Sequence, residues 1–258
     1  MQRPSSQTAI QVKDLHKTFG DQTILNGIDL TVARGETVVL LGRSGTGKSV
    51  LLKLMVGLQQ PDSGSILIDG QEITGLGWGG LSEIRKKIGF LFQQAALYDS
   101  LTVEENVVFP LARHTSMPVS ERRDQARALL ANVGMEGDLD KLPSQISGGM
   151  QKRVGLARAL ALNPEFLLFD EPTAGLDPIT AGEIGKLILK LKRQRRVTSL
   201  VVTHDIQASK AFSDRVILMD KGNVVIEGTF RELQNSSDAF VAQFLASTKG
   251  DLCQESLG

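Results

Sequence analysis

A glycine-rich segment, Gly42 to Ser49, carries the strongest chemical signal in the sequence. It reads GRSGTGKS and matches the phosphate-loop pattern G-x-x-x-x-G-K followed by Ser or Thr. The apolar run Thr37 to Leu41 before it predicts a strand, and Lys48 to Gly57 predicts a helix. Backbone N–H groups at such a strand-to-helix turn converge on phosphate. We therefore expect ATP here, with Lys48 at the β- and γ-phosphates and Ser49 on Mg²⁺. The expected ATP-binding residues of this segment are Gly42, Arg43, Ser44, Gly45, Thr46, Gly47, Lys48, Ser49 and Val50.

Two carboxylates, Asp170 and Glu171, follow a second apolar run at Phe166 to Phe169. Asp170 suits a residue that holds Mg²⁺ directly or through water, and Glu171 is placed to polarise an attacking water. Asp170 could instead cap a turn before a helix that starts near Pro172. The presence of a phosphate loop in the same chain favours the chemical role.

A second helix start with free backbone donors follows Ser147, Gly148 and Gly149. Met150 to Leu160 behind it has the pattern of an amphipathic helix, so its N-terminus can bind an anion. One phosphate loop per chain suggests that this second terminus serves nucleotide held by another copy. The alternative is an ordinary helix capped by serine.

The order and spacing of the phosphate loop, the SGG segment and the Asp-Glu strand resemble those of the ATP-binding cassette (ABC) ATPases. The resemblance runs from about Ile10 to Leu233. It implies that Phe19 stacks on adenine and that Gln93 contacts Mg²⁺ and links the site to a helical subdomain. It also implies that Asp177 lies in a loop that crosses a dimer interface.

The same resemblance implies that His204 contacts the γ-phosphate. Each of these roles has a simpler alternative, because Phe19 or His204 could belong to the core and Gln93 could be a surface amide. On this basis the expected catalytic residues are Glu171, His204 and Lys48, and the expected metal ligands are Ser49, Gln93 and Asp170.

The fold expected from these patterns is α/β, a P-loop NTPase of ABC type. It has a mostly parallel core sheet, an antiparallel β subdomain and an inserted helical subdomain. The ATPase domain is expected over 8–240, with the core and β subdomain at 8–96 and 160–240, the helical subdomain at 97–159 and a C-terminal tail at 241–258. Ser120 to Val133 predicts a helix with Ser120 as its N-cap. The expected strands are Ile10 to Leu15, Ile28 to Val32, Thr37 to Leu41, Ser65 to Asp69, Phe166 to Phe169, Ser199 to Thr203, Arg215 to Met219 and, after a turn, Val224 to Glu227.

Composition limits where such a protein can work. Lys and Arg together number 29, as do Asp and Glu, so no net charge draws the chain to nucleic acid or to anionic lipid. No apolar run is long enough to span a membrane. The N-terminus lacks the features of a secretory signal, and Cys253 as the only cysteine fits a reducing cytoplasm. Any membrane role is therefore expected to depend on a partner.

The partners implied by the resemblance begin with a second copy of the chain, in a head-to-tail dimer that sandwiches two ATP molecules. Val50, Met150 and the phrases around Gln93 and Asp177 are similar to the ATPases of bacterial MCE-type lipid transporters. That branch implies an integral-membrane permease, an MCE-domain protein and a small STAS-domain protein, with the ATPase on the cytoplasmic side of the inner membrane. Leu97, Tyr98 and Leu101 are expected either in the groove for the permease or in the core.

Other function classes remain as alternatives. The first is the ATPase subunit of an importer for amino acids or another small solute. ABC proteins of ribosomes or DNA repair would carry a second cassette or long heptad repeats, and a small-molecule kinase has no need of the SGG helix. The basic run Lys190 to Arg196 fits a solvated helix end better than a nucleic-acid site, and no nucleic-acid partner is expected.

Overall fold

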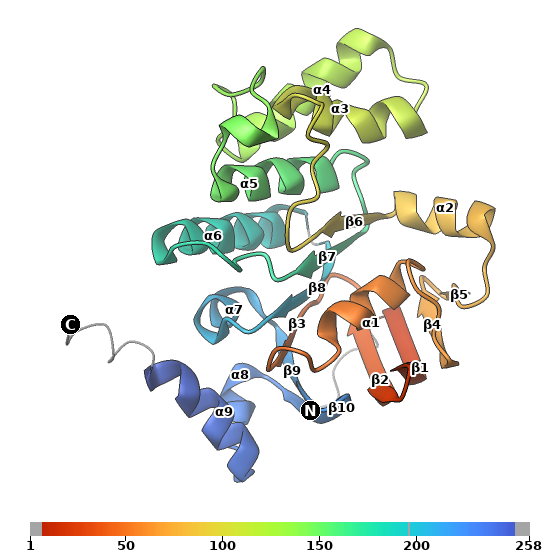
Figure 1. Cartoon of the computed structure of the whole chain (residues 1–258), viewed down its shortest axis with the longest axis vertical. Helices are drawn as coiled ribbons and strands as arrows, with labels where there is room; N and C mark the ends of the chain where they lie inside the picture. The colour runs from red at the N-terminus through yellow and green to blue at the C-terminus, as the bar shows by residue number, and fades with distance from the viewer. Residues whose placement is uncertain (1–6, 196, 251–258) are drawn as a thin grey trace.

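The computed structural model describes residues 7–195 and 197–250. Two β-sheets lie at its centre, with three helices stacked at one end and two short helical segments at the other (Figure 1). The predictions for the first six residues, for Cys253 and for the last part of the tail lie outside the described residues.

The larger sheet has the strand order β10-β9-β3-β8-β7-β6. Its centre is β3 (Thr37–Gly42), which pairs in parallel with β8 (Thr198–Thr203) on one side and β9 (Arg215–Asp220) on the other. β7 (Phe166–Asp170) and β6 (Ile88–Leu91) continue the parallel part. The hairpin strand β10 (Asn223–Gly228) alone runs antiparallel. The predicted mostly parallel core sheet is therefore confirmed.

Strands that are buried on both faces read as unbroken apolar runs, and β3 and β8 are buried along their whole length. Alternate residues of β3 face opposite sides, because successive side chains of a strand point in opposite directions. Val39 and Leu41 pack with the helices of one face, and Val38 and Leu40 pack against α1 and the second sheet. The molecule therefore has two hydrophobic cores that share one sheet.

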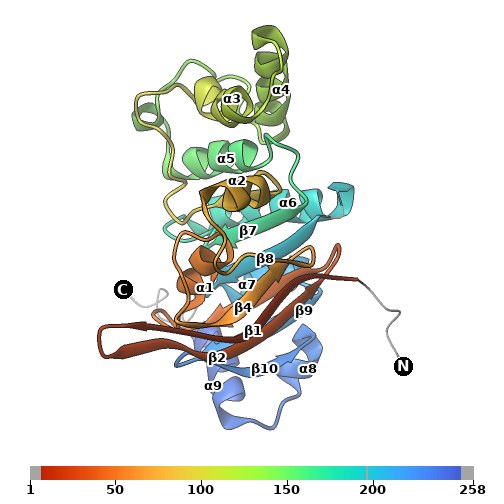
Figure 2. The ribbon, with the colours of Figure 1, turned by 90° about the vertical axis from the view of Figure 1, so that its right-hand side faces the viewer.

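The second sheet is antiparallel and has the order β2-β1-β4-β5. Its strands are β1 (Thr8–Phe19), β2 (Gln22–Ala33), β4 (Ser63–Ile68) and β5 (Gln71–Glu72). It forms a separate layer beside the main sheet (Figure 2). The helix α1 (Lys48–Met55) packs between the two sheets, with Leu51 and Leu52 fully buried. This confirms the predicted antiparallel β subdomain.

Three helices form what we call the helical end: α3 (Val103–His114), α4 (Val119–Asn132) and α5 (Gly148–Ala159), with a short 3-10 turn η1 (Pro143–Gln145) before α5. Thr102 and Glu105 form a capping box at the start of α3. The prediction that Ser120 caps α4 is wrong, because Pro118 is the N-cap residue and Ser120 lies in the first turn. The reason is the fixed φ of proline, −56° here, which suits the residue that leads into a helix.

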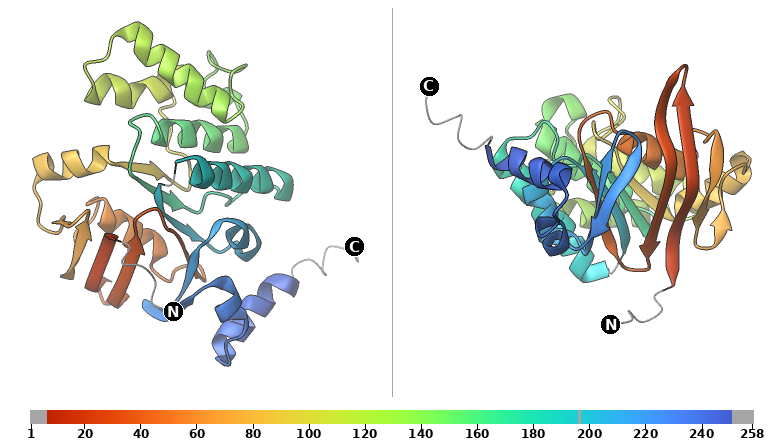
Figure 3. Two further views of the ribbon diagram at one scale, coloured as in Figure 1. Left: turned by 180° about the vertical axis from the view of Figure 1, so that it is seen from behind. Right: turned by 90° about the horizontal axis from the view of Figure 1, so that it is seen from below.

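Five further helices complete the described part of the fold: α2 (Trp78–Lys86), α6 (Pro178–Arg195), α7 (Ile206–Phe212), α8 (Phe230–Gln234) and α9 (Ala239–Gly250). The last two lie at the opposite end of the molecule from α3 and α4, next to β9 and β10 (Figure 3). Val241 and Phe244 of α9 are buried in the core. Within the described part of the chain, no helix combines the length and the apolar character that a membrane span needs.

Candidate nucleotide-binding site

One cleft collects most of the residues predicted to bind ATP. It opens between the loop before α1, the ends of β7 and β8, and the hairpin of β1 and β2. Its lining residues are Phe19, Gln22, Ile24, Ser44, Gly45, Gly47, Lys48, Ser49, Val50, Gln93, Glu171 and His204. Gln22 and Ile24 were not predicted as residues of the site. Their position in a hairpin next to Phe19 is the feature of the sequence that could have indicated them. Phe19 is 45% exposed at the edge of this cleft, and Lys17 Nζ lies over its ring, 5.3 Å from the ring centre.

The phosphate loop is shaped by its glycines. Gly47 has φ of 94°, and a Cβ there would lie 2.6 Å from Leu25 Cδ2, so only glycine fits. The following Lys48 is buried, and its ammonium donates to the carbonyls of Gly42 (2.9 Å) and Arg43 (2.8 Å). Burial lowers the pKa of Lys48, against the opposing effect of the Glu171 and Asp170 charges. The amine therefore already lies inside the loop, held by acceptors that an incoming phosphate can replace.

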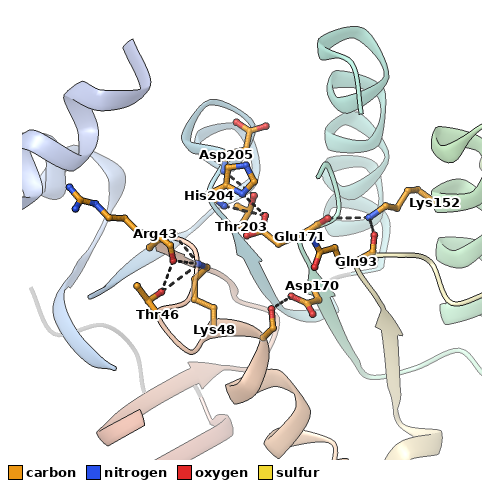
Figure 4. Close-up of polar contacts among 12 residues, drawn as sticks. Arg43, Thr46, Lys48, Gln93, Lys152, Asp170, Glu171, Thr203, His204 and Asp205 are labelled. Carbon is orange, nitrogen blue, oxygen red and sulfur yellow. Dashed lines mark hydrogen bonds and ion pairs between the residues drawn. The ribbon is translucent and has the colours of Figure 1, made fainter. Parts of the chain in front are cut away.

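Ser49 and Asp170 meet across the cleft although they are far apart in sequence. Ser49 Oγ donates to Asp170 Oδ1 at 2.6 Å (Figure 4). Burial raises the pKa of Asp170, and the Ser49 hydrogen bond opposes this shift. Hydroxyl and carboxylate oxygens are the ligands that Mg²⁺ prefers, usually together with substrate phosphates. Among the described residues no cluster of three acidic, His or Cys side chains forms a metal site, so an ion here would need oxygens of the nucleotide as well.

Glu171 and His204 form the second contact pair of the cleft. Glu171 Oε2 accepts from His204 Nδ1 at 2.9 Å and from the His204 backbone N–H at 3.3 Å. Glu171 has φ of 48°, a left-handed conformation that costs a residue with a side chain on the order of 1 to 3 kcal/mol. Its backbone N–H donates to Val202 O of β8, which helps to hold this turn. A strained acidic residue that faces a phosphate loop is typical of a catalytic position.

The remaining loop residues have structural partners. Thr46 Oγ1 donates to Arg43 O at 2.9 Å, and a Cβ on Gly42 would lie 2.6 Å from Met219 O, so the loop is pressed against β9. The Arg43 guanidinium lies 5.6 Å from the ring centre of Phe240 in α9. No local sequence pattern predicts this contact, because α9 is about 200 residues away from the loop along the chain.

The SGG segment lies outside the cleft. Ser147 is the N-cap of α5 and accepts from the Met150 backbone N–H at 3.3 Å. A Cβ on Gly149 would collide with Thr180 of α6, whereas Gly148 has open space up to 4.0 Å. None of Ser147, Gly148 and Gly149 lines the cleft that contains the phosphate loop. This position, outside the cleft of its own chain, is the one expected of a segment that binds the nucleotide of a second copy.

Asp177 also lies outside this cleft, at the start of α6. Its Oδ1 accepts from the backbone N–H groups of Ile179 and Thr180, both at 3.0 Å, and its Oδ2 accepts from Thr180 Oγ1 at 2.5 Å. These hydrogen bonds, first among them the one from the Thr180 hydroxyl, lower the pKa of Asp177. Within one chain Asp177 therefore caps a helix, and its role at a dimer interface stays a prediction.

A second hollow lies between α2, β6, α3 and α5. Its lining includes Phe90, Phe92, Tyr98 and Phe109. Tyr98 and Phe109 are each more than 40% exposed, with ring centres 4.6 Å apart. Leu97 packs instead against the core beside the helical end. Leu97 therefore fits the core alternative, whereas Tyr98 lines a surface hollow whose role as a groove for a permease stays a prediction.

The fold, the phosphate loop and the paired carboxylates define a cassette ATPase. Residues 25–174 match the family model described as ABC transporter, and the chain belongs to this family. The intermembrane phospholipid transport system ATP-binding protein MlaF of Haemophilus influenzae is 40% identical over 240 residues, which is 93% of this chain and 91% of that protein.

Two other curated relatives have names that point to solutes. The probable ribonucleotide transport ATP-binding protein mkl of Mycobacterium tuberculosis is 44% identical over 92% of this chain, and the methionine import ATP-binding protein MetN of Rhizobium johnstonii is 42% identical over 88%. The chain spans only 66% and 62% of the length of these two relatives. The solved dimer of the cassette MJ0796 bound to ADP and Pi is 37% identical, with a TM-score of 0.80 over 86% of this chain and 99% of that one.

Proposed function

We propose that this chain is the ATP-hydrolysing subunit of an ABC transporter and that the transporter moves phospholipids between the inner and outer membranes. The observation that carries the enzymatic part is the cleft in which Lys48, Ser49 and Glu171 meet. A phosphate loop, oxygen ligands for Mg²⁺ and a carboxylate base are together sufficient for attack of water on a γ-phosphate.

The reaction assigns a separate task to each side chain. Lys48 leaves the loop carbonyls and neutralises the β- and γ-phosphates. Ser49, Asp170 and Gln93 are the residues that would hold Mg²⁺, and the ion would supply charge neutralisation on the phosphate oxygens. Glu171 accepts a proton from the water that attacks the γ-phosphorus, while His204 orients Glu171 and faces the γ-phosphate. The products are ADP and phosphate. The stacking face of Phe19 holds adenine, a contact worth about 1 to 3 kcal/mol by analogy with base stacking.

The proposed assembly begins with a head-to-tail pair of chains. Ser147, Gly148 and Gly149 of each copy then meet the nucleotide held by the other, and Asp177 lies at the contact between them. The position of the SGG segment outside its own cleft supports this arrangement, as does the dimeric state of the related cassette MJ0796.

The membrane partner would occupy the second hollow, the one between α2, β6, α3 and α5. Exposed Tyr98 and Phe109 beside Phe90 and Phe92 form an aromatic, partly open surface with Arg85, His114 and Arg158 around it, which suits an amphipathic helix. An integral-membrane permease that inserts a cytoplasmic helix there would hold the chain on the cytoplasmic side of the inner membrane. An MCE-domain protein and a small STAS-domain protein complete the proposed complex.

The phospholipid cargo rests on the similarity to MlaF, which covers nearly the full length of both proteins. Its test uses a Gram-negative host in which this chain carries Lys48→Ala in the genome. We expect a weakened outer-membrane barrier to detergent and unchanged growth on single amino acids or sugars. A wild-type copy supplied in trans should restore the barrier. A mutant that keeps its barrier and loses uptake of one solute would support the importer alternative instead.

The enzymatic part has an independent test. Purified Lys48→Ala should lose ATP hydrolysis, because the cation that binds the phosphates is removed. Loss of hydrolysis together with an intact barrier would leave the ATPase assignment in place and reject only the lipid cargo.

A further inference from the structure

Lys152, a buried cation of α5, has no role among the functions assigned so far. Its side chain is 4% exposed, although a charged lysine is almost never buried without a partner. Its ammonium donates to the backbone carbonyl of Glu171 at 3.1 Å and to that of Gln93. Figure 4 shows Lys152 reaching between these two residues, of which Glu171 directly follows β7 and Gln93 follows β6.

Both ends of Glu171 are therefore held. Its carboxylate accepts from His204, and its carbonyl accepts from Lys152. The left-handed φ of 48° is a conformation that Glu171 keeps only because its surroundings impose it. A carbonyl fixed by a charge-assisted hydrogen bond also fixes the direction of the Cα–Cβ bond, and hence the position from which the carboxylate meets the cleft.

A second cation of α5 provides a comparison. The Arg158 guanidinium donates to the carbonyls of Ala95 and Ala96, both at 2.7 Å, so it holds the segment that follows Gln93. Arg158 has the same kind of contact as Lys152, from the same helix to the same loop. The Arg158 guanidinium donates to this segment, whereas the Lys152 ammonium donates to Glu171 as well.

We propose that Lys152 is a positioning residue that fixes the backbone at Glu171 and Gln93 and so places the Glu171 carboxylate for catalysis. This rests on the ATP hydrolysis proposed above. Because Lys152 belongs to α5, the same ammonium ties the catalytic carboxylate to the helix whose first turn carries Ser147, Gly148 and Gly149. Movement of the helical end then moves the backbone of the base.

The test compares the wild type with Lys152→Met, which keeps the length of the side chain and removes its donors. We expect kcat to fall on the order of 100-fold, the cost of a catalytic group displaced by about 1 Å. The affinity for Mg-ATP should change much less than kcat, because Lys152 does not itself line the cleft and acts there only through the backbone of Gln93 and Glu171. Lys152→Arg, whose guanidinium can reach both carbonyls, should recover a large part of the rate. If Lys152→Met does not fold, Lys152→Gln, which is shorter, uncharged and keeps one donor group, takes its place, with a smaller loss of kcat expected.

Two comparisons separate positioning from general packing. Arg158→Met removes the hydrogen bonds from α5 to the carbonyls of Ala95 and Ala96. It should lower kcat clearly less than Lys152→Met does, and an equal loss would overturn the proposal. In a Glu171→Gln background, Lys152→Met should cause no further loss of hydrolysis, because the carboxylate that it positions is already gone. A loss as large as in the wild type would also overturn it. A wild type without ATP hydrolysis would instead reject the proposed function.

Discussion

At the scale of single residues, the cleft combines side chains that the sequence marks plainly with partners that it does not mark. Lys48, Ser49 and Glu171 follow from short motifs, because phosphate binding demands a particular loop. Gln22 and Ile24 line the site from a segment whose sequence has no chemical signature. Lys152 lies in the helix behind the SGG segment, whose pattern marks the start of the helix but not this side chain. Their roles depend on which loops the fold brings together, and local pattern does not contain that information.

Glu171→Gln tests the base directly. The amide keeps the shape of the side chain and the Mg²⁺ ligand Asp170, and removes the proton acceptor. We expect ATP binding to persist and hydrolysis to fall by about 10²- to 10⁴-fold, the usual contribution of a general base. Closed dimers should accumulate with Mg-ATP and be seen by size-exclusion chromatography. Lys48→Ala is the control that should form none, and near wild-type turnover of Glu171→Gln would exclude Glu171 as the base.

At the scale of elements, periodicity located most of the predicted strands and the helix behind the phosphate loop to within a few residues. The prediction Ile28 to Val32 covers only the second half of β2 (Gln22–Ala33). The predicted strand Ile10 to Leu15 is the centre of the longer β1 (Thr8–Phe19). Strand β6 and helix α9 were not predicted as elements. β6 has only four residues, which is too short for a periodic pattern. α9 falls in the segment that was assigned to the C-terminal tail, although its residues are largely apolar. The N-cap of α4 is Pro118 and not Ser120, because the fixed φ of proline suits this position, and the usual preference for serine as a cap does not reveal this.

Gly149→Ala tests the contact between α5 and α6. The added methyl group would collide with Thr180 Cγ2, so we expect a loss of about 1 to 3 kcal/mol in the free energy of unfolding by urea. Thr180→Ser removes that methyl and keeps the hydroxyl that donates to Asp177, so it should restore most of the stability. Gly148→Ala, with nothing nearer than Leu176 at 4.0 Å, is the matched control. Equal effects of Gly149→Ala with and without Thr180→Ser would contradict this account.

The contact between α9 and the phosphate loop has its own measurement. A double-mutant cycle with Arg43→Met and Phe240→Leu should give a coupling energy of about 0.5 to 1 kcal/mol in urea unfolding, the usual size of an exposed cation–π contact. Coupling indistinguishable from zero would mean that α9 contributes nothing to the order of the loop through this pair.

At the scale of the whole molecule, the alternation of strands and helices predicted a parallel core sheet with helices around it, and the structure has one. The order of the strands could not be predicted from the sequence, because no local pattern in β3 indicates that it pairs with β8 and β9. Two cores on opposite faces of one sheet also explain why strands such as β3 lack an amphipathic pattern.

The position of β3 between β8 and β9 has a consequence during synthesis on the ribosome. β3 ends at Gly42, whereas its two neighbours span Thr198–Thr203 and Arg215–Asp220, so its hydrogen-bonding edges stay open until about four-fifths of the chain has been made. During that interval the unpaired edges and apolar faces of β3 can associate with other nascent chains. We expect an arrested chain that stops before Thr198 to bind chaperones and to be sensitive to protease across β3. A chain that extends past β10 and remains tethered to the ribosome should protect β3, and the phosphate loop that β3 leads into would be completed only then.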